Sequence, residues 1–175
     1  MSTDTGIRGG SAVAGLLLVL ALLMTGLATD HARATEEVTP RDKMLALTNQ
    51  DRKQHDKRVL RLNARLSRYA ARHSADMAEA GVLTHTPEKV LIKKLNDLAG
   101  SWSFGGENIG VSVSLEGVRK TLVELENAFM RSPDHRGNIL KTVYDHAAVG
   151  IFESPDNEKT DDIDPKVWVT VIFYG

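Results

Sequence analysis

The sequence predicts an α+β fold in which helices cover a mostly antiparallel sheet. Apolar residues recur at helical spacing before residue 105, and the pattern changes to strict alternation over 105–114. Two strand-like runs, 147–154 and 166–175, then end the chain as a hairpin. Helices, one strand, more helices and a terminal hairpin, in this order, indicate the α+β class.

Three helix starts share one pattern, a hydroxyl residue followed by proline: Thr39-Pro40, Thr86-Pro87 and Ser132-Pro133. Each hydroxyl can accept a hydrogen bond from a free amide of the first turn. Each proline occupies a position where an N–H would be left without a partner. The pattern therefore predicts helices that begin at these three places.

The elements follow in order. We expect a first helix over 40–56, a second over 63–81 that ends at Gly81, and a short third helix after Thr86. A strand over 105–114 precedes an amphipathic helix over 115–129, whose apolar residues are spaced by three and four. These residues are Leu115, Val118, Leu122, Leu125 and Phe129.

The N-terminal segment carries an apolar run at 11–28, followed by the small-residue motif Ala32-Arg33-Ala34. This pattern predicts a secretory signal peptide over 1–34, a linker over 35–40 and a single domain over 41–175. The alternative is an uncleaved membrane anchor, because about 18 apolar residues can just span a bilayer. Either interpretation places the domain outside the cytoplasm, either secreted or associated with the cell envelope.

The composition excludes several classes of function. The net charge of −1 argues against a nucleic-acid partner, which would require a basic face. The absence of cysteine removes disulfides, thiol nucleophiles and cysteine-based metal sites. The acidic segment 153–164 lacks the spacing and central glycine of a calcium loop, so a solvated hairpin loop is the favoured interpretation over a calcium site.

Three polar residues are candidates for a site. His85 precedes the predicted Thr86 cap, and His135 is the third residue of its helix, where the positive helix end should keep its imidazole neutral. Glu107 follows two glycines, which permit close backbone approach or unusual backbone torsions. Spacing alone forms no recognised metal motif, so a structural role for all three stays open. His73 lies on an apolar helix face, which favours a core residue over a ligand.

Four ordered motifs resemble the CAP superfamily of cysteine-rich secretory, antigen 5 and pathogenesis-related proteins, in its bacterial, cysteine-free branch. The motifs are ARHSADMAEAGVLTHT, GENIG, AFMRSPDHRGNIL and WVTVIFYG, and the likeness covers 41–175. The resemblance implies a three-layer α-β-α sandwich with a central mixed sheet. It also implies a surface cleft that binds a divalent metal, often zinc, in some members.

Carried over by motif, the implied metal ligands are His85, Glu107 and His135. A fourth, acidic ligand of animal and plant members corresponds to Ser132, so the site has three predicted ligands. Asn108 and Arg136 belong to the same motifs and are interpreted first as scaffold, with Asn108 and Ser132 flanking the cleft.

The resemblance favours a secreted binding module that takes a divalent metal and a lipid, sterol, glycan or protein partner. Two alternatives stay open: a metal-dependent hydrolase of extracellular or envelope polymers, and a structural protein without an active cleft. Two histidines and a carboxylate could hold Zn²⁺ with an open position, but no separate general base is evident. Binding is therefore favoured over catalysis.

Overall fold

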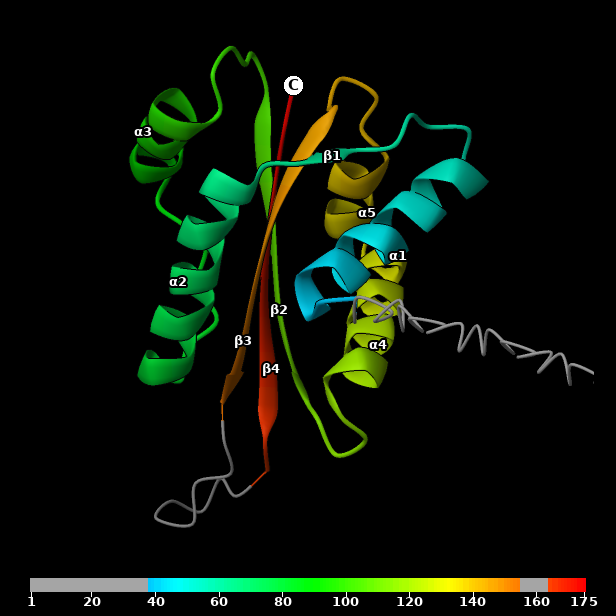
Figure 1. Ribbon diagram of the computed structural model, residues 1–175, viewed down its shortest axis with the longest axis vertical. Coiled ribbons are helices and arrows are strands. Elements are labelled where there is room, and N and C mark those ends of the chain that lie inside the picture. The colour runs from blue at the N-terminus through cyan, green and yellow to red at the C-terminus, as the bar shows by residue number, and fades with distance from the viewer. Residues whose placement is uncertain (1–37, 155–163) are drawn as a thin grey trace, which may run out of the picture. The chain divides into compact units, whose positions relative to one another are not determined.

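The computed structural model describes residues 38–154 and 164–175, which belong to one compact unit, Glu36–Gly175. Helices and strands follow one another in a mixed order along the chain (Figure 1). They are α1 (Pro40–Gln54), β1 (Arg61–Leu62), α2 (Ala64–Ala80), α3 (Glu88–Leu98), β2 (Gly105–Val113), α4 (Val118–Arg131), α5 (Pro133–Leu140), β3 (His146–Ser154) and β4 (Lys166–Tyr174). The predicted α+β class is confirmed.

The sheet has the order β1-β3-β4-β2 and is mixed, as expected. β1 pairs in parallel with β3, whereas β4 pairs in antiparallel fashion with both β3 and β2. Helices α2 and α3 cover one face, and α1, α4 and α5 cover the other (Figure 1). The result is the three-layer α-β-α sandwich that the resemblance implied, with β2 and β3 flanking the central strand.

Strand β4 shows why the layers form. Its alternate residues enter two different cores: Val169 and Val171 pack under α1 and α4, whereas Ile172 and Tyr174 pack under α2 and α3. A strand covered on both faces is apolar at nearly every position, and β4 is buried from Val167 to Tyr174. Its buried Thr170 has a partner for its hydroxyl, Ser74 Oγ at 2.9 Å. The nearly continuous apolar run in the sequence therefore reflects a strand between two helical layers.

The three predicted helix starts have different outcomes. Thr39 caps α1, because its Oγ1 accepts a hydrogen bond from the Asp42 amide at 3.2 Å. Ser132 occupies the cap position of α5 with proline after it, but its side chain makes no capping bond. The Thr86 cap was wrong: α3 begins at Glu88, after Pro87. Tertiary hydrogen bonds hold Thr86 instead, as described below.

Several predicted boundaries were also shifted. Helix α1 ends at Gln54 rather than at residue 56, and the left-handed Asp56 follows it. Helix α4 begins at Val118 because Gly117, with φ 86°, precedes it, and Leu115 is left 74% exposed. The two-residue strand β1 was not predicted. The predicted signal peptide and most of the acidic loop lie outside the described residues.

No helix within 38–154 or 164–175 is long and apolar enough to cross a membrane.

Gly150 marks the place where α2 packs directly on β3. A Cβ atom there would lie 2.0 Å from the Ala70 carbonyl carbon, which belongs to helix backbone and cannot move alone. We expect Gly150→Ala to lower the free energy of unfolding by about 1–3 kcal/mol in urea denaturation. Gly137→Ala is the control, because nothing lies within 4 Å of its new Cβ and alanine favours a helix. Equal stability of the two variants would contradict this account.

Candidate functional site

Glu107 forms the buried centre of the site. It lies on β2, which is an edge strand of the sheet and is separated from β3 by β4. Only 4% of its side chain is accessible. Its Oε1 accepts hydrogen bonds from the His85 ring Nδ1 and from the Thr86 amide, both at 2.9 Å. Its Oε2 is buried and has no hydrogen-bond partner among residues 38–154 and 164–175. A buried carboxylate oxygen in this state is a free acceptor, which requires a water, an ion or a ligand group.

The two glycines before Glu107 allow close approach, the first of the two alternatives that the sequence left open. A Cβ at Gly105 would lie 2.7 Å from Leu95 Cδ1, and one at Gly106 would lie 2.6 Å from the Tyr144 hydroxyl. Their backbone torsions are ordinary, because neither has a positive φ. The glycines therefore let helix α3 and the segment after α5 close around the start of β2.

His85 connects Glu107 to solvent. It lies in the segment between α2 and α3, and 59% of its side chain is accessible. Because Nδ1 faces Glu107, the other ring nitrogen, Nε2, remains available to a ligand. Two exposed aliphatic residues, Leu83 and Val82, precede it by two and three positions. The segment therefore combines one imidazole with an apolar surface.

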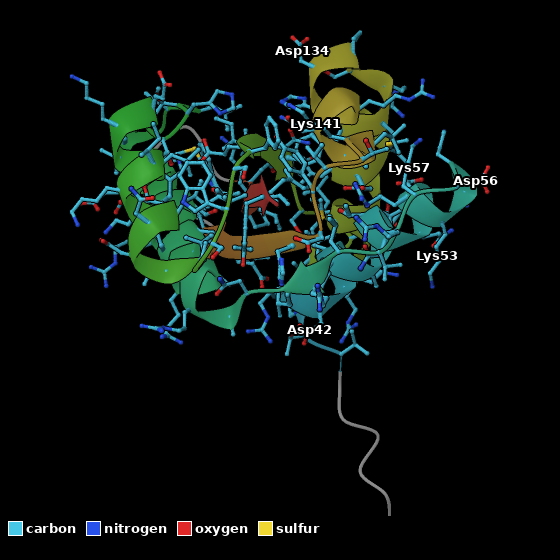
Figure 2. The ribbon with its side chains drawn as sticks, turned by 90° about the horizontal axis from the view of Figure 1, so that it is seen from above. Asp42, Lys53, Asp56, Lys57, Asp134 and Lys141 are labelled. Atoms are coloured by element: carbon cyan, nitrogen blue, oxygen red, sulfur yellow. The ribbon has the colours of Figure 1, made fainter. Side chains whose placement is uncertain are left out.

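His135 approaches the site from the other helical layer. It is the third residue of α5, and its ring packs against Phe129 with centroids 4.9 Å apart. Burial and the charge of His85 lower the pKa of His135, and the charge of Asp134 opposes this shift. Asp134 itself points outward into solvent (Figure 2). The net direction supports the predicted neutral imidazole.

Asn108 has the scaffold role that its motif predicted. It is fully buried, and its side-chain amide donates to the His135 carbonyl at 3.0 Å. It accepts from Asn138 Nδ2 at 2.9 Å, and the same Asn138 amide lies 3.3 Å from the Glu107 carbonyl. Asn138 therefore joins β2 to α5. No sequence signal indicated this role, because a polar residue in a short helix has no distinctive spacing.

The other histidines have structural contacts. His73 stacks on Tyr69, and its Nε2 lies 2.9 Å from the Thr84 carbonyl, which supports the non-ligand interpretation although the residue is half-buried rather than core. His146 stacks on Tyr174 and pairs with Asp145. Ser132 brings a hydroxyl, not a carboxylate, to the start of α5.

The predicted three-ligand metal centre does not fit the geometry as it stands. Within the described ranges, no group of three His, Cys, Asp or Glu side chains is placed to hold one ion. Glu107 Oε1 already accepts two hydrogen bonds and faces the His85 ring. This is the relation of an outer carboxylate to a metal-binding histidine, which leaves the two imidazoles as candidate ligands. Zinc binding stays a prediction.

The motifs that form this site also match a known family. Residues 45–173 match the model of the CAP family, described as the cysteine-rich secretory protein family. The chain belongs to the CAP family. It contains no cysteine, so no disulfide stabilises this CAP domain.

One curated protein is similar in sequence, and solved structures share the fold. The uncharacterized protein YkwD of Bacillus subtilis is 30% identical over 114 residues, which are 64% of this chain and 42% of that protein. An extracellular SCP-domain protein from Bacillus anthracis superposes with a TM-score of 0.58 at 21% identity, over 77% of this chain and 40% of the other. An outer surface protein from Borrelia burgdorferi superposes with a TM-score of 0.56 at 18% identity, over 78% of this chain and 95% of the other. This CAP domain thus spans about two-fifths of YkwD.

Proposed function

We propose that this CAP domain is a binding module of the extracellular space or cell envelope, with its ligand site at His85, Glu107 and His135. The hydrogen bond from His85 to the buried Glu107 carries the proposal, because a buried carboxylate fixes the imidazole and directs its free nitrogen outward. The location rests on structural relatives described as an extracellular protein and an outer surface protein.

The chemistry around His85 favours an amphiphilic ligand. His85 Nε2 and the neutral His135 ring supply polar contacts, and Val82 and Leu83 supply exposed aliphatic surface beside His85. A lipid or sterol with one polar head matches this combination better than a fully polar glycan. A divalent ion held by the two imidazoles would add positive charge for an anionic head group.

The hydrolase alternative gains no support from the contacts. A metal-dependent hydrolase needs a general base that can reach a bound water. Glu107 instead has one oxygen committed to His85 and Thr86 and is almost fully buried. Binding therefore remains the better proposal.

Zinc titration of the whole protein tests the metal part of the proposal. We expect His85→Ala and His135→Ala each to weaken Zn²⁺ binding at least about tenfold in calorimetry, and Glu107→Gln to weaken it about 10- to 100-fold as an outer carboxylate. Because the pKa of His135 is lowered, protonation of His135 should weaken binding only at a pH below the ordinary histidine value. His55→Gln, at the C-terminal end of α1, is the control.

A fluorescent fatty acid tests the ligand part separately. Binding should weaken in His85→Ala and in Leu83→Ser, with or without zinc. If the affinities for zinc and for the fatty acid are both unchanged in His85→Ala and in His135→Ala, the site has only a structural role.

A further inference from the structure

The outer edge of β3 is paired only at its beginning. The short strand β1 pairs with His146 and Ala147, and within the described ranges no strand lies beside the rest of β3 on that side. The Asn63 amide donates to the Ala147 carbonyl across this edge. Because backbone groups alternate in direction along a strand, every second residue after Ala147 also faces the open edge.

The residues that face this edge are Val149, Ile151 and Glu153. The Val149 amide donates to Ser67 Oγ of α2 at 3.1 Å, which confirms the direction. The Val149 carbonyl and both backbone groups of Ile151 and Glu153 have no hydrogen-bond partner among the residues that the structure describes. The edge therefore presents free donors and acceptors at the spacing of a strand.

A groove of about 350 Å³ runs along the same edge. Its walls are the first residues of α1 and one face of α2, and Val149, Ile151 and Glu153 line it between them. Figure 1 shows β3 between these two helices, which lie on opposite faces of the sheet. The groove is thus open where β1 ends.

Arginines give this groove an excess of positive charge. Arg41 and Arg68 line it on opposite walls, and Glu153 is an opposing charge at its floor. Arg65 and Arg72 lie on the same side of α2, because they are three and four residues from Arg68. Arg65, Arg68 and Arg72 form no ion pair with the residues described, and Arg41 pairs with its neighbour Asp42.

We propose that this groove binds an extended acidic peptide segment of a partner protein, which adds a strand to the free edge of β3. A peptide backbone offers N–H and C=O groups at the repeat that the edge requires, which lipids and glycans do not. Carboxylates along the peptide complement the arginines of both walls. This site is separate from the His85 site, which lies at the β2 edge.

The arginine charge argues against a second copy of this chain as the occupant, and the exposed residues of α2 argue against a membrane surface. A second copy of this chain would bring its own arginine row against this one. A membrane surface would require exposed aliphatic or aromatic residues beside the arginines, whereas the exposed residues of α2 are polar, charged or alanine.

Peptide binding to the whole protein tests the proposal. The probe is a capped peptide of about seven residues with alternating glutamate and valine, a typical strand length, measured by calorimetry. Two peptide controls are alternating lysine and valine, and the acidic peptide with N-methyl groups at alternate amides. We expect the acidic peptide to bind and both control peptides to fail. Salt should weaken the binding, and the bound peptide should slow hydrogen exchange at the Ile151 and Glu153 amides.

Matched variants separate charge from backbone pairing. Arg68→Glu should weaken binding roughly fivefold or more, whereas Lys89→Glu, an equal charge change on α3, should not. Glu153→Gln removes a repulsive carboxylate and should tighten binding. Glu153→Pro has the same charge change but lacks the edge-facing N–H, so it should bind roughly fivefold more weakly than Glu153→Gln.

The proposal is overturned if the methylated peptide binds as well as the parent peptide, or if the two Glu153 variants bind equally. It is also overturned if the peptide fails to bind and sedimentation shows a dimer that Glu153→Pro disrupts, because the edge would then pair with a second copy. His85→Ala should leave peptide binding unchanged.

Discussion

Replacing Arg52 with methionine should lower the free energy of unfolding by about 3–5 kcal/mol. Arg52 is fully buried near the end of α1, and its hydrogen-bond partners are backbone carbonyls. Nε donates to the Arg58 carbonyl at 2.7 Å. Nη1 donates to the carbonyls of Ile139 at 2.6 Å and Lys141 at 3.0 Å, and Nη2 donates to the carbonyl of Tyr144 at 3.0 Å. Methionine would leave these carbonyls buried without a donor.

The control is the neighbouring Lys53→Met. Lys53 is exposed and points into solvent (Figure 2), so its loss should change stability by less than about 0.5 kcal/mol. Arg52→Lys should be intermediate, because one ammonium group cannot reach every carbonyl. Urea denaturation followed by circular dichroism measures all three. Equal midpoints for Arg52→Met and the wild type would show that the guanidinium does not hold these segments together.

Glu126→Gln should stabilise the protein at neutral and alkaline pH but change little in acid. Glu126 lies on α4, is 2% exposed, and neither of its carboxyl oxygens has a hydrogen-bond partner among the described residues. Burial raises the pKa of Glu126 to about 8, the Thr48 hydroxyl opposes the shift, and Asp51 adds to it. The folded protein therefore holds a neutral carboxyl group where the unfolded chain is already ionised.

The direction of the pH effect follows from proton uptake. The unfolded chain loses this proton near pH 4.5 and the folded protein near pH 8, so stability falls as the pH rises between these values. The total loss is about 3–5 kcal/mol. Glutamine does not titrate, so the advantage of Glu126→Gln should grow across this interval. A constant difference between variant and wild type in denaturation at pH 4.5, 6 and 8 would contradict the raised pKa.

The fold places a candidate recognition surface at each open edge of the sheet. At the β2 edge, His85 comes from the segment before α3 and pairs with Glu107 of β2, and His135 comes from α5. At the β3 edge, the groove is formed by α1, α2 and the strand itself. The central strand β4 lies between β3 and β2, so the two surfaces are at opposite edges of the sheet.

Sequence spacing predicted the elements well where periodicity is long, as in α2 and β4. It failed at Thr86, where a local pattern typical of a helix cap competed with a tertiary hydrogen bond. The Thr86 amide donates to Glu107, and its hydroxyl lies 3.3 Å from the Tyr69 hydroxyl. Such contacts join residues far apart in the chain, and no spacing rule contains them. Strand β1 was missed for the same reason, since two residues carry no period.

The sequence alone determined the α+β class, the family motifs and the choice of His85, Glu107 and His135 as candidate site residues. Only the tertiary structure decided how they meet. Glu107 faces His85 as a buried acceptor, and no three side chains of the described residues are placed to hold one ion. It also decided the buried environments of Arg52 and Glu126, which look like ordinary charged helix residues in the sequence. The physical reason is that hydrogen bonding, burial and pKa depend on neighbours in space, which chain spacing does not specify.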